Sequence, residues 1–170
     1  MTDYLYFCKK ILRMANILSI SDYIIFRLKS EGDIDLNTLK HQKLLYYVQA
    51  WYLAFFEKPL FEEDFQAWIH GPVNREIYDI YKEGKNLYSE LTIDDIKDKT
   101  NIESLSEEER IHVDTILDSY ANFSSTQLEL MTHKEIPWIE TRKGLTPYER
   151  CEKTISKDLM REYYKARLNN

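Results

Sequence analysis

The chain has 170 residues and a mass of 20.5 kDa, which is the size of one compact domain. Hydrophobic residues make up 44 % of it and charged residues 31 %, a composition typical of a globular rather than a disordered protein. With 23 Lys and Arg against 29 Asp and Glu, the net charge of −6 argues against binding nucleic acid through a broad basic surface.

The N-terminal residues predict two helices in succession. Apolar residues recur at helical spacing between Tyr4 and Leu18, which indicates an amphipathic helix within residues 1–18. A second, shorter helix is expected to begin after Ser19, with Asp22 completing a capping box, and to stop at Gly32.

A longer helix over about 36–56 is predicted to be the hub of the fold. Asn37 or Thr38 can cap it, and Pro59 follows its end. Its second half is apolar on almost every face, the pattern of a helix surrounded by protein. Its first half is expected to expose a polar arc formed by Lys40, His41, Gln42 and Lys43. The structural core is expected to include Leu44, Tyr47, Trp51, Tyr52 and Gly71.

Residues 65–70 alternate apolar and polar side chains, which predicts either one strand of a short β-hairpin or an extended segment lying on the helices. Gly71 and Pro72 form a turn after it, and Asn74 can open a further helix that ends near Gly84. The polar stretch 85–105 is too long for a structureless loop in a compact domain, so part of it is expected to be helical.

The last third of the chain carries the clearest helix starts. Ser106 with Glu109, and Ser124 with Gln127, both have the spacing of a capping box. Pro137 suits the first turn of another helix. A terminal helix capped by Ser156 is expected, and the residues that face the core from it should be Leu159, Met160, Tyr163, Tyr164 and Leu168. The predicted fold class is therefore mainly α, a single compact helical domain around the buried helix at 36–56.

No motif for catalysis or cofactor binding is present, so we expect neither an enzyme nor a cofactor. P-loop, GxGxxG, GxSxG and HExxH patterns are all missing. Cys8 and Cys151 form no CxxC pair and predict neither a zinc site nor a disulfide framework. A metal-dependent enzyme would have to assemble its ligands in three dimensions near His70 and His133, and this alternative stays open.

The location expected is the cytoplasm, where two isolated cysteines remain reduced. Charged residues interrupt every potential secretory signal near the N-terminus. The longest apolar stretch, residues 44–56, falls short of the roughly 18–20 residues that span a bilayer. No membrane partner is therefore expected.

Aromatic residues outside the predicted helices favour protein binding. Trp68 and Trp138 lie in turns or extended segments, where Trp often serves as an interface anchor. Lys40 and Lys43 beside Tyr46 could instead form a small nucleic-acid patch, an alternative that the acidic net charge opposes.

Three sequence blocks together resemble the Panacea, or SocA-like, antitoxin domain of bacterial and phage genomes. They are LKHQKLLYYVQAWYLAFFEKPLF at 39–61, FQAWIHGPV at 65–73 and LELMTHKEIPW at 128–138. His41 stands where the family usually has leucine. Residues 19–170 would form the antitoxin domain, and residues 1–18 an additional helix or an upstream extension, because Met14 opens a segment similar to a typical family start.

The resemblance implies an antitoxin that binds and neutralises a cognate toxin encoded next to it, without catalytic residues. One branch of the family instead delivers its toxin to a ClpXP-type protease, so a proteolytic adaptor is the alternative. The candidate partner-binding residues are Lys40, Lys43, Tyr46, Trp68, His70, Pro72, His133 and Trp138.

Overall fold

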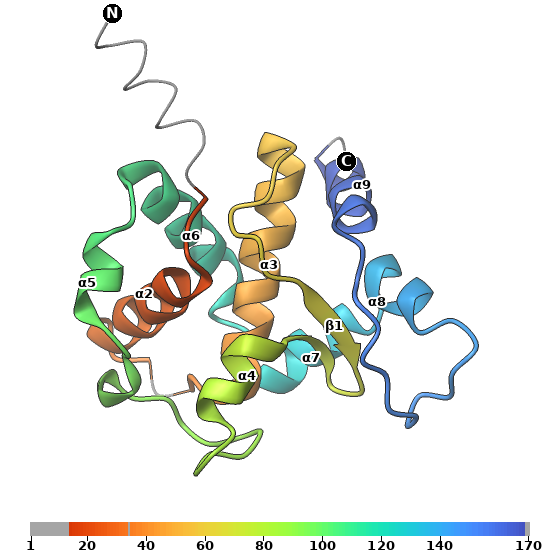
Figure 1. The fold of residues 1–170 in the computed structure, drawn as a ribbon, viewed down its shortest axis with the longest axis horizontal. Helices are drawn as coiled ribbons and strands as arrows, with labels where there is room; N and C mark the ends of the chain where they lie inside the picture. The colour runs from red at the N-terminus through yellow and green to blue at the C-terminus, as the bar shows by residue number, and fades with distance from the viewer. Residues whose placement is uncertain (1–13, 34, 169–170) are drawn as a thin grey trace, which may run out of the picture.

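A central helix, α3, organises the structure (Figure 1), a computed structural model that describes residues 14–33 and 35–168. The helices α2, α5 and α6 lie on one side of α3, and α8 and α9 on the other. In chain order the elements are α2 (Ile17–Ser30), α3 (Thr38–Phe56), β1 (Phe65–Trp68), β2 (Gly71–Asn74), α4 (Arg75–Tyr81), a 3-10 helix η1 (Ile93–Asp95), α5 (Lys99–Glu103), α6 (Glu107–Tyr120), α7 (Ser125–Thr132), α8 (Ile136–Thr141) and α9 (Lys157–Arg167).

The predictions of a mainly α fold and of a central helix are confirmed. The side chain of Asn37 caps α3 by accepting a hydrogen bond from the backbone N–H of Lys40, 2.9 Å away. The helix ends at Glu57, which adopts a left-handed conformation with φ of 56°. Between these ends α3 packs against α6, α7, α9 and β2, so its sides are largely buried.

The prediction for the start of the second helix was wrong. Helix α2 begins at Ile17 with Asn16 as its cap, whereas Ser19 and Asp22 are buried inside it. The Asp22 carboxylate accepts hydrogen bonds from the backbone N–H groups of Lys97 and Asp98, and so fastens the segment before α5 to α2. Ser19 and Asp22 thus have the spacing of a capping box, but Asp22 makes a tertiary contact instead. Most of the helix predicted over Tyr4–Leu18 lies outside the described residues.

The expected polar arc on α3 was also wrong, because all four side chains are buried. Asp33, α2 and β2 supply polar partners to this half of the helix. Lys40 Nζ lies 3.1 Å from Asp33 Oδ2, and Lys43 Nζ donates to the carbonyl of Pro72 at 3.0 Å. His41 is hydrogen-bonded to Ser21, and Gln42 is hydrogen-bonded to the backbone of Asn74.

The predicted β-hairpin is confirmed. Strands β1 and β2 pair antiparallel, with Phe65 opposite Asn74 and Trp68 opposite Gly71. The chain segment before α9 adds to the other edge of β1, since Ala67 N–H donates to the carbonyl of Lys153 at 2.9 Å. The hairpin is therefore held between α3 and the C-terminal part of the chain.

In the C-terminal half, the secondary structure agrees closely with the predictions from the sequence. Both capping boxes are present, at the starts of α6 and α7, and η1 and α5 supply helical structure within 85–105. Helix α9 buries Met160 and Tyr164, but Leu168 is exposed, because it caps the helix end beyond the core.

Aromatic rings fill the core around α3. Leu44, Tyr46, Tyr47 and Tyr164 are fully buried, and the ring of Tyr47 stacks on Tyr120 at 4.0 Å between centroids. Leu44 and Tyr47 thus lie in the core as expected. Trp51 and Tyr52, also expected in the core, are partly buried and pack against its edge.

Candidate functional site

Four of the candidate partner-binding residues meet at one place, although they come from blocks about 60 residues apart in the chain. Trp68 and His70 lie in and after β1, whereas His133 and Trp138 lie between α7 and α8 and within α8. Trp138 Nε1 donates to the carbonyl of Trp68 at 2.9 Å, and His70 Nδ1 lies 2.9 Å from Glu129 Oε1 of α7. The hairpin tip and the α7–α8 junction therefore form one continuous structure.

Ring stacking fixes the junction. The rings of His133 and Trp138 lie 4.2 Å apart with an angle of 24° between their planes. Burial, only partly offset by the charge of Glu129, lowers the pKa of His133, so the imidazole is neutral at pH 7. A neutral ring stacked on indole offers a flat, largely apolar contact surface.

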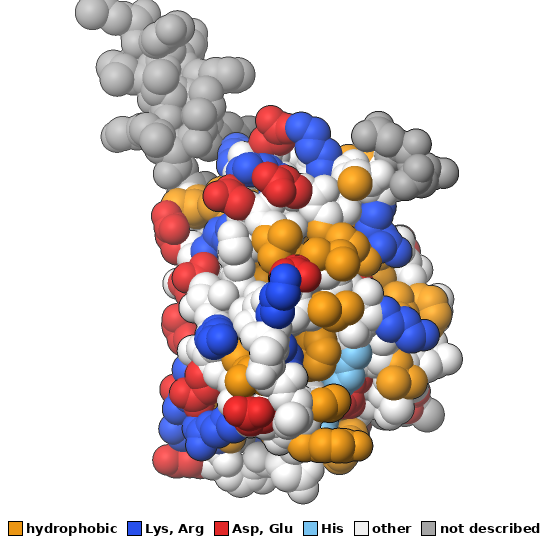
Figure 2. All heavy atoms as spheres, turned by 90° about the vertical axis from the view of Figure 1, so that its right-hand side faces the viewer, with side chains coloured by type: hydrophobic (Ala, Val, Ile, Leu, Met, Phe, Trp, Pro, Cys, Tyr) orange, Lys and Arg blue, Asp and Glu red, His pale blue; other side chains and the backbone are white. Residues whose placement is uncertain are grey.

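Exposed aliphatic side chains border this junction. Leu130 of α7 and Ile136 and Ile139 of α8 are all exposed. Figure 2 shows hydrophobic side chains gathered around histidine on the face that carries α8 and α9. We call this region the hairpin surface, and define it by Trp68, His70, His133, Trp138, Leu130, Ile136 and Ile139.

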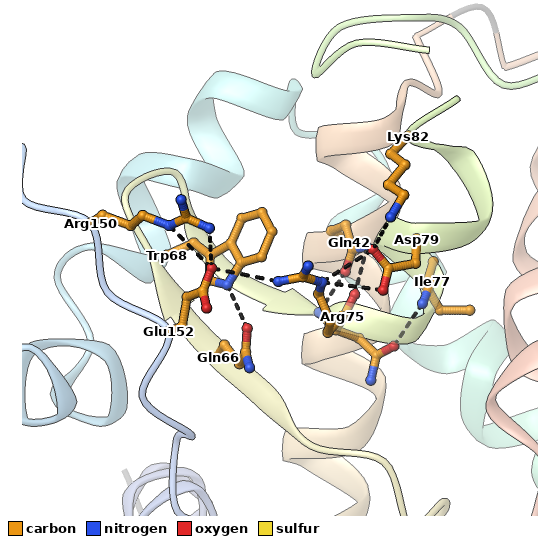
Figure 3. Close-up of polar contacts among 10 residues, drawn as sticks. Gln42, Gln66, Trp68, Arg75, Ile77, Asp79, Lys82, Arg150 and Glu152 are labelled. Carbon is orange, nitrogen blue, oxygen red and sulfur yellow. Dashed lines mark hydrogen bonds and ion pairs between the residues drawn. The ribbon is translucent and has the colours of Figure 1, made fainter. Parts of the chain in front are cut away.

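Charged groups frame Trp68 on the side toward α4 (Figure 3). The Arg75 guanidinium lies 5.7 Å from the centre of the indole and 3.5 Å from Glu152, and it also pairs with Asp79. Tyr78 meets the indole edge-on at 4.7 Å. The indole is thus held in place by its neighbours while part of it stays accessible.

Gly71 fits the hairpin closely against α3 and α7. Its φ of 92° lies in the left-handed region, and a Cβ built there would be 2.6 Å from Lys43 Cε and 2.7 Å from Thr132 Oγ1. Burial lowers the pKa of Lys43 to about 7, against a weaker opposing effect of Glu129. Gly71 begins β2 and does not form the turn predicted with Pro72, because the chain turns at residues 69 and 70. Only glycine at this position leaves room for the buried lysine.

A buried carboxyl group, Glu135, supports the α7–α8 junction from below. Glu135 is the N-cap of α8, and its two oxygens accept hydrogen bonds from Tyr47 Oη at 3.0 Å and Tyr164 Oη at 2.5 Å. Burial raises the pKa of Glu135 to about 7, against the opposing effect of these hydrogen bonds. This residue joins α3, α9 and the junction.

Glu135→Gln is expected to change how stability depends on pH. Because its folded-state pKa of about 7 exceeds the ordinary 4.5, Glu135 contributes most stability below pH 4.5 and loses that contribution as pH rises to 7. The variant keeps an acceptor for the tyrosine hydroxyls but cannot titrate. Denaturant unfolding between pH 4.5 and 7.5 should show a flatter curve for the variant; parallel curves would contradict the assignment.

Arg142 holds the loop after α8 against the hairpin. Its guanidinium is buried and donates to the carbonyls of Ala67, Thr146, Pro147 and Glu149 at 2.7 to 3.3 Å. It also lies 4.9 Å from the centre of the Trp138 ring. One side chain therefore connects β1, α8 and the loop.

The structure separates the candidate partner-binding residues into two groups. Trp68, His70 and His133 have accessible side chains, and Trp138 is almost buried behind them. The side chains of Lys40, Lys43, Tyr46 and Pro72 are buried, so in this conformation they are not accessible to a partner. Burial of the two lysines also removes the small basic patch on which the nucleic-acid alternative rested.

Sequence reasoning missed Glu135, Arg142 and the exposed aliphatic residues of α7 and α8. The first two look like ordinary surface charges in the sequence, and only the tertiary structure surrounds them. Leu130, Ile136 and Ile139 could have been noticed, because they fall off the inward stripes of their short helices.

The hairpin surface presents side chains suited to non-covalent contacts. Among residues 14–33 and 35–168, no group of three or more His, Cys, Asp or Glu side chains is placed to hold a metal ion. Within the same ranges, no helix is long and apolar enough to cross a membrane. Aromatic rings, aliphatic side chains and a few fixed charges are what a protein-binding surface typically presents.

The fold is that of a small, mainly helical domain with one two-stranded hairpin. Residues 42–139, more than half of the chain, match the family described as antitoxin SocA-like, Panacea domain, and the protein belongs to this family. Membership supports an antitoxin role in general. Neither the curated proteins nor the solved structures include a significant match.

Proposed function

We propose that this protein is an antitoxin that binds and neutralises a toxin encoded by an adjacent gene, and that it does so through the hairpin surface. The main support for this proposal is that separate motif blocks of the sequence meet at one place in the structure. Two motif blocks of the family, 65–73 and 128–138, meet through the hydrogen bond from Trp138 to the Trp68 carbonyl and present their rings together.

The surface suits a protein partner physically. Leu130, Ile136 and Ile139 supply apolar area beside the accessible rings of Trp68 and His133, and such a combination is typical of interface hot spots. The net charge of −6 would attract a basic partner and raise the association rate. In this proposal the protein acts in the cytoplasm, where the toxin is made.

The test is co-expression of the toxin gene with variants of this protein. Ile136→Glu places a charge in the hairpin surface but should not disturb α8, because Ile136 is exposed (44 %) and an acidic residue suits the first turn of a helix. We expect this variant to lose protection of the cells while its melting temperature stays close to that of the wild type.

A matched control is Ile93→Glu. Ile93 is equally exposed (46 %) and also begins a helical turn, but it lies in η1, away from the hairpin surface. This control should protect cells fully. Equal protection by both variants would exclude the hairpin surface as the toxin-binding site. Failure of the wild type to protect would exclude the antitoxin function itself.

The same assay distinguishes neutralisation by direct covering from delivery to a protease. If binding alone neutralises the toxin, rescue should persist in cells that lack ClpXP. If the protein is an adaptor, rescue should disappear in those cells while the purified pair still associates.

A further inference from the structure

A tyrosine side chain faces solvent in the loop between α8 and α9. Tyr148 is 88 % exposed, the largest fraction among the exposed large hydrophobic side chains of residues 14–33 and 35–168. Leu145, which lies in the same loop, is instead partly buried against the core. The loop therefore uses one apolar side chain for packing and presents one ring to water, and the order of the loop decides whether that ring can serve as a contact.

Tyr148 lies at the tip of a tight turn. The backbone N–H of Glu149 donates to the carbonyl of Thr146 at 3.2 Å, and the backbone N–H of Thr146 donates to the Glu149 carboxylate, also at 3.2 Å. Pro147 occupies the second position of this four-residue turn, where its fixed φ is favourable. Tyr148 is the third residue, so the turn directs attention of a partner to its ring.

The buried guanidinium of Arg142 holds this turn from beneath. It donates to the carbonyls of Thr146 at 3.2 Å, Pro147 at 3.3 Å and Glu149 at 2.7 Å. Burial of a guanidinium is costly unless its N–H groups find acceptors, and the turn supplies three of them. The turn has therefore lost its conformational freedom in the folded protein, so that fixing the ring of Tyr148 in a complex costs little further entropy.

Both ends of the loop are joined to the hairpin surface. At its start, the guanidinium that holds the turn lies 4.9 Å from the centre of the Trp138 ring. At its end, Glu152 pairs with Arg150 and with Arg75, and the Arg75 guanidinium lies beside the indole of Trp68 (Figure 3). The loop projects beyond α8 in Figure 1, on the side that faces the viewer in Figure 2. A partner that covers the hairpin surface would therefore meet this loop next.

We propose that Tyr148 is a further contact residue for the toxin, that its ring enters an apolar recess of the toxin beside the area that covers the hairpin surface, and that Arg142 is the positioning residue for it. This inference rests on the function proposed above. Tyrosine suits the role because it buries a large ring, keeps a polar hydroxyl group and has only two side-chain torsions to fix. The toxin-binding surface then extends from the hairpin to the loop after α8.

Binding titrations with the purified product of the adjacent toxin gene test this proposal. Tyr148→Ala is expected to weaken the complex by about tenfold or more, which is typical of a lost interface anchor. Its melting temperature should stay close to that of the wild type, because the side chain is exposed. Tyr148→Phe should bind within about threefold of the wild type, because the ring supplies most of the contact. Unchanged binding by Tyr148→Ala, or an equal loss with Tyr148→Phe, would overturn the proposal.

The control is Phe26→Ala, which also removes an exposed ring. Phe26 (42 % exposed) lies on α2, on the opposite side of α3 from α8 (Figure 1), so this variant should bind the toxin as tightly as the wild type. Equal weakening by Phe26→Ala and Tyr148→Ala would overturn the proposal. If Ile136→Glu weakens the complex and Tyr148→Ala does not, the role of Tyr148 is wrong while the hairpin surface stands. If the wild type forms no complex, both proposals are wrong.

A double-mutant cycle tests the positioning role of Arg142. Arg142→Lys is expected to weaken toxin binding by about threefold or more when Tyr148 is present, because the loosened turn must be ordered again on binding. In the Tyr148→Ala background the same substitution should change binding by less than about twofold, since the contact that it positions is already lost. The titrations are made at a temperature at which circular dichroism shows each variant to be folded. Equal effects of Arg142→Lys in the two backgrounds would overturn this role, because a purely structural residue would act on both alike.

Discussion

Replacement of Gly71 by alanine is expected to destabilise the protein by about 2–5 kcal/mol, through backbone strain and overpacking together. The Cβ would approach Lys43 Cε and Thr132 Oγ1 at less than 3 Å. Neither side chain can easily move away, since Lys43 Nζ is held by the Pro72 carbonyl and Thr132 Oγ1 donates to the Glu129 carbonyl at 2.8 Å. Denaturant unfolding of the variant measures the loss.

The Gly32→Ala variant separates the effect of backbone strain from that of overpacking. Gly32 has a similar φ of 84°, but nothing lies within 4 Å of a Cβ built there. The Gly32→Ala substitution should therefore lower the free energy of unfolding through backbone strain alone, by about 1–2 kcal/mol. Equal losses at the two positions would show that the hairpin does not fit closely over Lys43.

Arg142→Ala is expected to cost about 3–5 kcal/mol, because four backbone carbonyls lose a charged donor at once. Arg142→Lys should recover less than half of this, since one ammonium cannot reach both Ala67 and the 146–149 loop. Denaturant unfolding gives the cost, and hydrogen exchange should show faster opening of that loop.

The control for this prediction is Arg150→Ala. Arg150 is exposed and forms an ion pair with Glu152, so its removal should change stability by no more than about 0.5 kcal/mol. If Arg142→Ala were equally mild, Arg142 would not be what holds the loop to the hairpin.

Local signals in the sequence predicted most of the secondary structure correctly. The capping boxes of α6 and α7, the Asn37 and Asn74 caps and the alternating strand all depend on residues within a few positions of one another. Such signals are readable because the hydrogen bonds that they describe are local. The one misplaced start, at α2, arose because Asp22 bonds to residues 75 positions away.

Burial of polar residues could not be predicted in the same way. The stretch from Lys40 to Lys43 is polar in sequence, and it is buried where α2, Asp33 and β2 each bring a partner to it. Glu135 is a similar case, since its two hydroxyl partners come from α3 and α9. Residues of the site were recognised mainly through the family resemblance, and the structure then separated accessible rings from buried supports.

The most direct measurement is a binding titration between the purified protein and the product of the adjacent toxin gene. Our account expects a saturable complex that Ile93→Glu leaves unchanged and that Ile136→Glu weakens at least about tenfold, equivalent to about 1.4 kcal/mol. A complex that forms equally well with Ile136→Glu, or the absence of any complex with the wild-type protein, would contradict it.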